Sequence, residues 1–125
     1  MIKLVYCVRR RADVPAEEFH RYWLEEHGPL VRSVAGDMRA LRYVQSHTAM
    51  PEVNAAFRDG RGLAEPYDGI TEVWWASAAE LVSGGATDAG REAARRLQED
   101  EAKFIDFARS RMFMTEEHEI FDFSD

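Results

Sequence analysis

Two segments with helical periodicity separate four short segments of strand character, and this order restricts the fold. The strand candidates are Ile2–Val8, Arg39–Thr48, Ile70–Ala76 and Arg111–Phe121. The helical candidates run from Pro15 towards Val34 and from Asp88 to Ala108, with a short helix from Ser77 to Val82. Strand, helix, strand, strand, helix, strand is the order of a ferredoxin-like βαββαβ protomer of the α+β class. We therefore expect an antiparallel sheet with helices on one face.

The strand candidates are apolar on both sides, which predicts a second cover for the sheet. In the first strand, Leu4 and Tyr6 lie on one face while Val5 and Cys7 lie on the other. Helices on one face would leave the other face bare, and another copy of the same sheet is the simplest cover. We expect a homodimer with its sheets packed face to face, as in a dimeric α+β barrel.

Length and charge limit the classes of function. The 125 residues fit one domain, which we place at residues 1–121, followed by an acidic tail at 122–125. A net charge of −7 makes nucleic acid an improbable partner. No run is long and apolar enough to predict a membrane span or a signal peptide, so the expected location is the cytoplasm. The single Cys7 has no partner for an internal disulfide and fits a buried, inert thiol.

The segment from Ala49 to Asp68 is long for a connection inside a compact domain. It holds a possible helical turn at Val53–Phe57. Two interpretations stay open, a lid over a binding site and a flexible surface insertion.

His27 stands where the first helix meets Gly28-Pro29, a step expected to interrupt it. Helical spacing places the histidine on the apolar face of Phe19 and Trp23, so its ring should point towards the sheet. Burial lowers the pKa of an imidazole, whereas the C-terminal end of a helix raises it. A pKa near neutrality would suit general acid/base catalysis. The alternative is a core histidine bonded to a carbonyl group.

The run from Phe19 to Leu30, FHRYWLEEHGPL, resembles the signature of EthD-domain proteins, which belong to the dimeric α+β barrel superfamily. Tyr67–Trp75 and Met114–His118 are similar to the third and last strands of that family. The resemblance implies a ferredoxin-like protomer, a face-to-face dimer and a pocket between helices and sheet. The family includes a component of an ether-degradation cluster and dehydratase-like proteins of aromatic polyketide pathways.

A weaker similarity, to methylmuconolactone methylisomerase, suggests residues for catalysis. The active-site histidine and tyrosine of that cofactor-free enzyme match His27 and Tyr43. Two of its other groups do not carry over, because the 49–68 segment has no histidine and Val73 stands in place of its cysteine. The resemblance therefore implies related proton transfers without implying the same reaction.

Other candidate residues surround this pair. Tyr43 and His47 share a strand face and line either the pocket or the dimer interface, depending on the register. Asp68 either orients the histidine or caps a turn. The residues expected to bind substrate are Tyr22, Trp23, His47, Asp68 and Trp74. No metal or nucleotide motif occurs, and His118 with its acidic neighbours makes a poor metal site, so no cofactor is expected.

Three functions fit these patterns. The first is a cofactor-free dehydratase, cyclase or isomerase for a small oxygenated aromatic or polyketide-like molecule, with His27 as proton shuttle and Tyr43 as hydrogen-bond donor. The second is a cofactor-free monooxygenase of activated phenols. The third is a non-catalytic protein that binds a hydrophobic intermediate of an oxidative degradation pathway.

Overall fold

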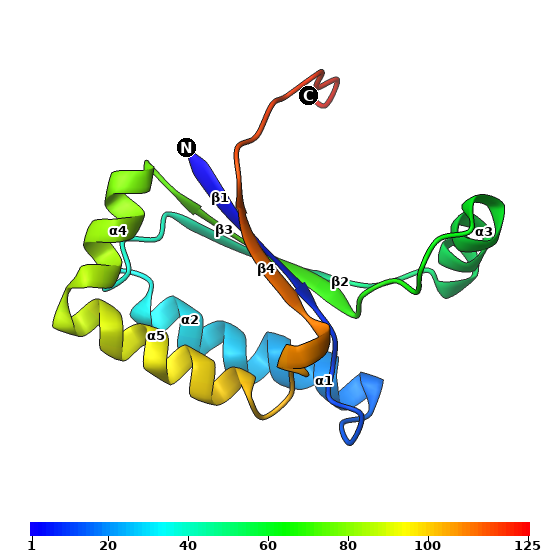
Figure 1. The fold of residues 1–125 in the computed structure, drawn as a ribbon, viewed down its shortest axis with the longest axis horizontal. Coiled ribbons are helices and arrows are strands. Elements are labelled where there is room, and N and C mark those ends of the chain that lie inside the picture. Colours follow the sequence, from blue (N-terminus) through cyan, green and yellow to red (C-terminus); the bar gives the residue numbers. More distant parts are fainter.

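The computed structural model describes residues 1–125 as a four-stranded antiparallel sheet with helices packed on one face (Figure 1). The strands are β1 (Ile2–Val8), β2 (Arg42–His47), β3 (Gly69–Trp75) and β4 (Arg111–Thr115). Their order across the sheet is β2-β3-β1-β4, and every neighbouring pair is antiparallel. This is the predicted ferredoxin-like arrangement, with β3 and β1 at the centre.

The register decides which strand residues face the helices. Leu4 of β1 lies opposite Val73 of β3, which lies opposite Tyr43 of β2. Opposite residues of paired strands share a face, so this row lies on the same side of the sheet as the row Tyr6, Thr71, Gln45. Tyr6 and Thr71 are buried beneath the helices. The register therefore turns Tyr43 towards the helices, away from the bare face.

The first helical segment is continuous from α1 (Ala16–Tyr22) through the π-helical turn η1 (Trp23–His27) to α2 (Gly28–Val34). Gly28 keeps helical angles, φ −54° and ψ −51°, and its N–H donates to the carbonyl of Trp23, five residues earlier. The predicted interruption at Gly28-Pro29 is therefore wrong. The wider π turn accommodates Pro29, which lacks an N–H and would crowd a carbonyl of the preceding turn in a regular helix.

The second helical segment consists of α4 (Ala78–Ala86) and α5 (Asp88–Glu101). The side chains of Ser77 and Thr87 accept hydrogen bonds from backbone N–H groups in the first turns of these helices. The predicted start at Ser77 is confirmed, but α4 continues past Val82 and α5 ends at Glu101, short of the predicted Ala108. A 3-10 turn, η2 (Phe107–Arg109), then leads to β4. No helix combines the length and the apolar character needed to cross a membrane.

The 49–68 segment contains a helix, α3 (Pro51–Arg61), that projects away from the sheet and the other helices (Figure 1). The predicted short turn at Val53–Phe57 is thus part of a longer helix. Met50 before it and Gly62 after it both adopt left-handed backbone angles. None of the α3 residues lines the large cavity between the helices and the sheet, so α3 is not a lid over it.

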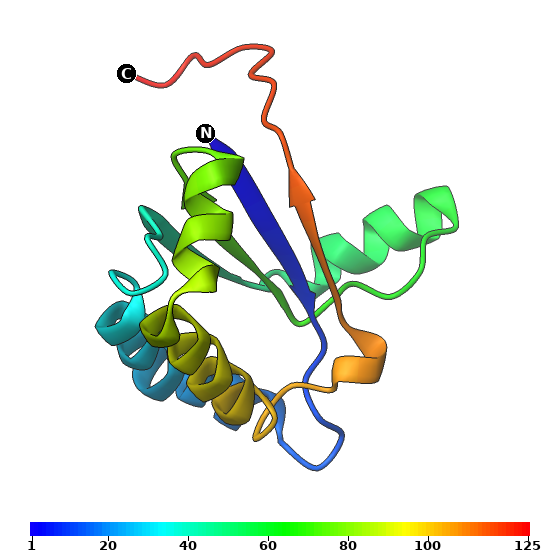
Figure 2. The ribbon, with the colours of Figure 1, turned by 60° about the vertical axis from the view of Figure 1, so that its left-hand side comes forward.

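The last strand is shorter than the predicted Arg111–Phe121, because pairing with β1 stops at Thr115. Beyond it the chain runs as an extended segment away from the helices (Figure 2). Ile120 and Phe123 are each 86% exposed and make no core contact. Because these apolar side chains stay in water, this part of the chain gains no hydrophobic stabilisation that would hold it against the sheet.

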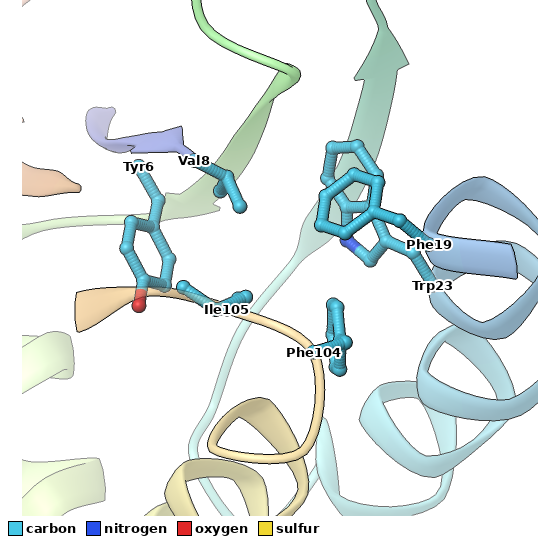
Figure 3. Close-up of a cluster of buried hydrophobic side chains, with 6 residues drawn as sticks. All are labelled: Tyr6, Val8, Phe19, Trp23, Phe104 and Ile105. Atoms are coloured by element: carbon cyan, nitrogen blue, oxygen red, sulfur yellow. The ribbon is translucent and has the colours of Figure 1, made fainter. Parts of the chain in front are cut away.

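The hydrophobic core joins the first helical segment to β1 and to the chain that follows α5 (Figure 3). Its six buried members are Tyr6, Val8, Phe19, Trp23, Phe104 and Ile105. Phe19 packs its ring 5.4 Å from that of Trp23 and 5.6 Å from that of Phe104. Burial of each such side chain contributes roughly 1.5–3 kcal/mol. The core therefore fixes the positions of η1 and of the end of α5, which carry the polar residues of the site.

Candidate functional site

A cavity of about 940 Å³ lies between the helices and the sheet and opens to solvent. Seventeen of its 25 lining residues are hydrophobic. Its polar lining includes His27 from η1, Tyr6 and Tyr43 from the sheet, and Glu101 from α5. The volume and the apolar walls are those of a site for a small organic molecule.

His27 lies in the wall of this cavity with only 5% of its surface exposed. Its Nδ1 atom is 2.7 Å from Oδ2 of Asp100, near the end of α5. A carboxylate only accepts, so Nδ1 carries the hydrogen and Nε2 is the basic nitrogen of the neutral ring. Nε2 makes no hydrogen bond within the protein, and no buried polar side-chain atom lacks a partner, so Nε2 is reached by solvent. The basic nitrogen is open to a ligand.

Asp100 is held by groups from two elements. Oδ1 accepts a hydrogen bond of 2.5 Å from the Tyr22 hydroxyl and lies 3.3 Å from Nζ of Lys103. Burial alone would raise the pKa of Asp100, but the hydrogen bonds from Tyr22 and His27 outweigh it and hold this pKa below 3.8. Asp100 is therefore an anion at neutral pH and fixes the orientation of the imidazole.

Burial is also the main influence on His27. It lowers the pKa of the imidazole below 6.5, while the hydrogen bond and the charge of Asp100 act in the opposite direction. The expected effect of a helix C-terminus is absent, because the helix continues to Val34. His27 is thus neutral at physiological pH, as a general base requires.

Tyr43 offers a hydrogen-bond donor to the same cavity. Nε2 of Gln45 donates both to the Tyr43 hydroxyl, at 2.7 Å, and to the carbonyl of Trp23, at 2.8 Å. Because a carbonyl oxygen can only accept, this contact fixes the orientation of the Gln45 amide. The Tyr43 oxygen is then an acceptor for Gln45, and its own hydrogen can be donated to another acceptor. Burial raises the pKa of this hydroxyl, so it stays protonated.

Glu101 is the second ionisable group with a perturbed pKa in the lining. Burial raises the pKa of its carboxyl from 4.5 to about 7, the Tyr6 hydroxyl lowers it by hydrogen bonding, and the charge of Asp100 raises it further. A carboxyl of this kind exchanges protons at neutral pH.

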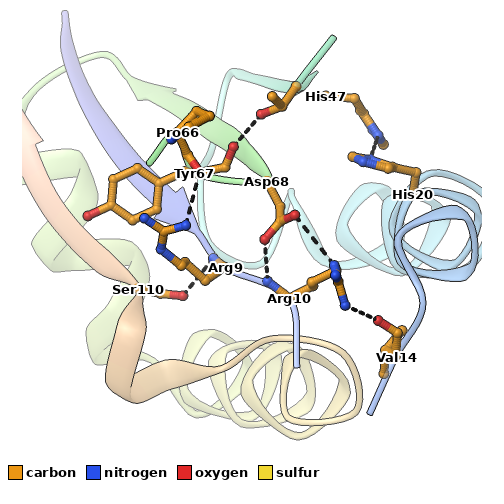
Figure 4. A network of polar contacts seen from close by, with 10 residues as sticks. Arg9, Arg10, Val14, His20, His47, Pro66, Tyr67, Asp68 and Ser110 are labelled. Atoms are coloured by element: carbon orange, nitrogen blue, oxygen red, sulfur yellow. Dashed lines mark hydrogen bonds and ion pairs between the residues drawn. The ribbon is translucent and has the colours of Figure 1, made fainter. Parts of the chain in front are cut away.

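His47, which is also predicted to bind substrate, lies outside the cavity. His47 packs against Trp23 with ring centroids 4.3 Å apart, and its Nδ1 lies 2.8 Å from Nδ1 of His20 (Figure 4). Its Nε2 bonds Oε1 of Gln45. His47 thus helps to hold the Gln45 side chain in place through its amide oxygen. The register turns the strand face of Tyr43 and His47 towards the helices, and of these two residues only Tyr43 lines the cavity.

Asp68 does not orient His27. Its carboxylate accepts a hydrogen bond of 2.9 Å from the backbone N–H of Arg10 and lies 3.7 Å from Nε of the same arginine (Figure 4). The structure therefore supports neither expected role, because the chain after β1 takes up both carboxylate oxygens. Asp68 anchors that chain to the start of β3.

Trp74 lies on the opposite face of the sheet, between Lys3 and Arg42, whose cationic groups lie 5.4 and 4.4 Å from its ring centroid. The structure does not bring it to the cavity. The alternation of β3 places Trp75 there instead, with its indole N–H bonded to the carbonyl of Met38 at 2.9 Å. Trp23 lines the cavity, whereas Tyr22 does not: its hydroxyl donates to Asp100 and its ring packs 5.2 Å from that of Phe104.

Sequence reasoning missed Asp100, Glu101 and Gln45. A signal was present for Glu101, because it falls on the apolar helical stripe of Leu97 and Phe104, where a carboxylate is unusual. Gln45 gave a similar signal as a polar residue on a strand face that turned out to be buried. The structure contains no group of three or more histidine, cysteine or acidic side chains arranged to hold a metal ion.

Comparisons with known proteins agree with this architecture. A family model of the EthD domain matches residues 11–108. An EthD family protein from Bacillus halodurans superposes with a TM-score of 0.62 at 17% identity, over 94% of this chain and 99% of that chain. A dimeric protein of unknown function and ferredoxin-like fold from Bacteroides fragilis gives a TM-score of 0.58 at 10% identity, over 92% and 94%.

A third solved structure is that of a candidate antibiotic biosynthesis monooxygenase from Deinococcus radiodurans. Its TM-score is 0.53 at 12% identity, over the full length of both chains. At these identities the similarity concerns the fold. No curated protein matches the sequence.

Proposed function

The chain belongs to the EthD domain family, and we propose that it is a cofactor-free acid/base enzyme of the dehydratase, cyclase or isomerase type. One observation carries the proposal. The Nδ1 atom of His27 is held by Asp100, Nε2 is open to solvent, and the residue lines an apolar cavity. A neutral imidazole with one nitrogen fixed and the other open is the arrangement that general base catalysis needs.

The proposed chemistry uses the side chains of the cavity. Nε2 of His27 removes a proton from a carbon next to a carbonyl group of the substrate. The electron pair of that C–H bond forms a C=C bond, and the carbonyl π pair moves to the oxygen. The Tyr43 hydroxyl donates a hydrogen bond to this enolate oxygen, and Gln45 keeps it oriented for this role.

The lining supports a substrate with a flat apolar body and few oxygen atoms. Trp23 and Trp75 supply aromatic surface, and the hydrophobic residues outnumber the polar ones. A small oxygenated aromatic or polyketide-like molecule has this balance, with a ring for the walls and a carbonyl for Tyr43.

Exchange of hydrogen for deuterium in 2-tetralone tests the proposal without the natural substrate. This bicyclic ketone carries an acidic C–H between its ring and its carbonyl group, and NMR in heavy water follows loss of that proton. We expect the protein to accelerate exchange and His27→Ala to lose ~10²–10⁴-fold in rate, the usual worth of a positioned acid/base group. His118→Ala, in the exposed C-terminal segment, is the matched control and should keep the wild-type rate.

Two results would contradict the proposal. One is a wild-type rate no higher than that of free imidazole at the same concentration. The other is a folded His27→Ala variant, checked by circular dichroism, that keeps the wild-type rate.

Two further functions use the same cavity and are separated by simple measurements. The fold shared with the candidate monooxygenase motivates oxidation of an activated phenol. Oxygen uptake with a hydroxyanthrone, absent in a His27→Ala variant, would favour that reaction. Tight binding of 2-naphthol combined with no turnover of any probe would favour a binding protein.

The proposal includes a homodimer in the cytoplasm, where the one cysteine, Cys7, stays reduced. The sheet face opposite the helices carries Val5, Val44, Ile70 and Phe113, and the last two are 37% and 49% exposed. A second copy of the sheet would bury this surface. In sedimentation, wild type should behave as a dimer and Ile70→Lys as a monomer, while Ile120→Lys, in the C-terminal segment, should remain a dimer.

A further inference from the structure

Glu101 occupies the last position of α5 and lines the same cavity as His27. The preceding residue, Asp100, points to the imidazole. Neighbouring residues of a helix project about 100° apart, so the two carboxylates serve different surroundings. Asp100 binds Nδ1 of His27 and does not line the cavity, whereas Glu101 lines the space that a substrate would fill.

No cation neutralises Glu101. The groups that act on its charge are the Tyr6 hydroxyl on β1 and the Asp100 carboxylate on its own helix, and no lysine or arginine is among them. On β2, the buried Tyr43 hydroxyl also experiences its charge. A half-buried carboxyl that has no cationic partner favours its neutral, protonated form. In this form Glu101 is a proton donor, whereas the anionic Asp100 is not.

We propose that Glu101 is a second catalytic residue, the general acid that protonates a leaving hydroxyl group while His27 removes the proton from the neighbouring carbon. The inference rests on the proposed function and narrows it to dehydration of β-hydroxy carbonyl compounds. An elimination removes a proton from carbon and adds a proton to the leaving oxygen, so it suits a site with one proton acceptor and one proton donor.

The elimination balances without any added reactant. Nε2 of His27 takes the proton from the carbon next to the carbonyl, and the C–H electron pair forms the new C=C bond. The C–O bond to the hydroxyl group breaks, its electron pair leaves with oxygen, and the Glu101 carboxyl supplies the proton that completes a water molecule. The imidazolium then loses its proton to solvent and the carboxylate gains one, which restores the starting state.

Dehydration of 4-hydroxy-2-tetralone to 2-naphthol and water provides the test, because the product is fluorescent. We expect Glu101→Gln to slow this reaction by ~10²-fold or more, since an amide cannot donate a proton in this way. The same variant should exchange the protons of 2-tetralone at close to the wild-type rate, because exchange needs a base and no leaving group. Glu99→Gln, two residues away on α5 and exposed, is the matched control for both reactions.

Each outcome bears on one proposal. A Glu101→Gln variant that dehydrates at the wild-type rate, or slows both reactions equally, overturns the role of Glu101. So does wild-type protein that exchanges 2-tetralone but does not accelerate dehydration. Absence of exchange in the wild type overturns the proposed function instead.

A readout without turnover keeps the inference independently testable. Carbon NMR of protein labelled at the glutamate carboxyls should show one resonance that titrates near neutral pH and disappears in Glu101→Gln. If the Glu101 resonance titrates in the ordinary range, with a pKa of about 4.3, the group is an anion under working conditions and cannot be the acid.

Discussion

The Nδ1 atom of His27 lies 2.7 Å from Oδ2 of Asp100, a contact between residues 73 positions apart in the sequence. It joins the π-helical turn of the first helical segment to the last turn of α5. The contact sets the orientation and the tautomer of the imidazole, whereas burial keeps the ring neutral.

Asp100→Asn should lower the pKa of His27 further, because the carboxylate is the group that opposes the effect of burial. Heteronuclear NMR of the imidazole over a pH series measures this directly. Exchange of 2-tetralone should also slow, by about 10–10²-fold, since a poorly oriented base transfers protons less efficiently. An unchanged or higher His27 pKa in the variant would show that Asp100 does not act on the ring.

Tyr22→Phe should weaken acid stability. The Tyr22 hydroxyl is one of the groups that hold the pKa of Asp100 low, so this carboxylate contributes stability above its unfolded-state pKa, 3.8, that is lost as pH falls through the lower folded-state value. Without the hydroxyl the loss should begin at higher pH, with a stability decrease of about 1–2 kcal/mol near neutrality. Urea denaturation at several pH values checks both effects. Tyr67→Phe, on the surface beside Arg9, is the control.

Glu101→Gln should stabilise the protein in mildly alkaline solution. The folded state holds the Glu101 proton with a pKa of about 7, against 4.5 in the reference state, so wild-type stability falls as pH rises between these values. The difference between these two pKa values corresponds to about 3 kcal/mol in the free energy of unfolding. The stability gap between variant and wild type should therefore open as pH rises from 4.5 to about 7, stay constant above that, and close in acid. A gap that does not change with pH would contradict the raised pKa.

Tyr43→Phe should slow exchange of 2-tetralone by about 10²-fold while leaving the His27 pKa little changed. The reason is the loss of one preorganised donor to the enolate oxygen, an effect of this size in other enzymes. Steady-state exchange rates and the NMR titration of His27 separate the two quantities. Equal rates for Tyr43→Phe and the Tyr67→Phe control would remove Tyr43 from the proposed chemistry.

Replacement of the two neighbouring tryptophans should give different results. Trp75→Phe should weaken binding of 2-naphthol by roughly 3–10-fold, because Trp75 contributes aromatic surface to the cavity. Trp74→Phe, on the far face of the sheet between Lys3 and Arg42, should leave binding unchanged. Isothermal titration calorimetry measures both. Weaker binding in Trp74→Phe alone would indicate a ligand site on the other face.

Local patterns predicted most elements and failed at their ends. The Gly28-Pro29 step indicated a break, yet the buried face of Phe19 and Trp23 keeps the helix continuous through a π turn. Ile120 and Phe121 extended the last strand in the prediction, but no partner strand reaches them. In both places the outcome depended on contacts with distant residues, which neighbouring sequence does not encode.

For the candidate site residues too, the sequence predicted some positions, and packing between distant segments decided the others. The apolar face of the helix predicted the inward direction of His27 and Trp23, because helical spacing alone sets that direction. The choice between Trp74 and Trp75 depended on the register of β3 against β1, since a shift of one residue exchanges the two faces of a strand. Asp100 became the partner of His27 only through the packing of α5 beside η1.

The sequence by itself determined the order of the four strands and the two main helical segments and the inward direction of one imidazole, because these depend on hydrophobic periodicity along the chain. The tertiary structure alone decided which carboxylate holds that imidazole, which carboxyl becomes a proton donor and which tryptophan reaches the cavity. Those properties arise from desolvation and short-range hydrogen bonds between residues that are distant in sequence, and they exist only after the helices have packed on the sheet.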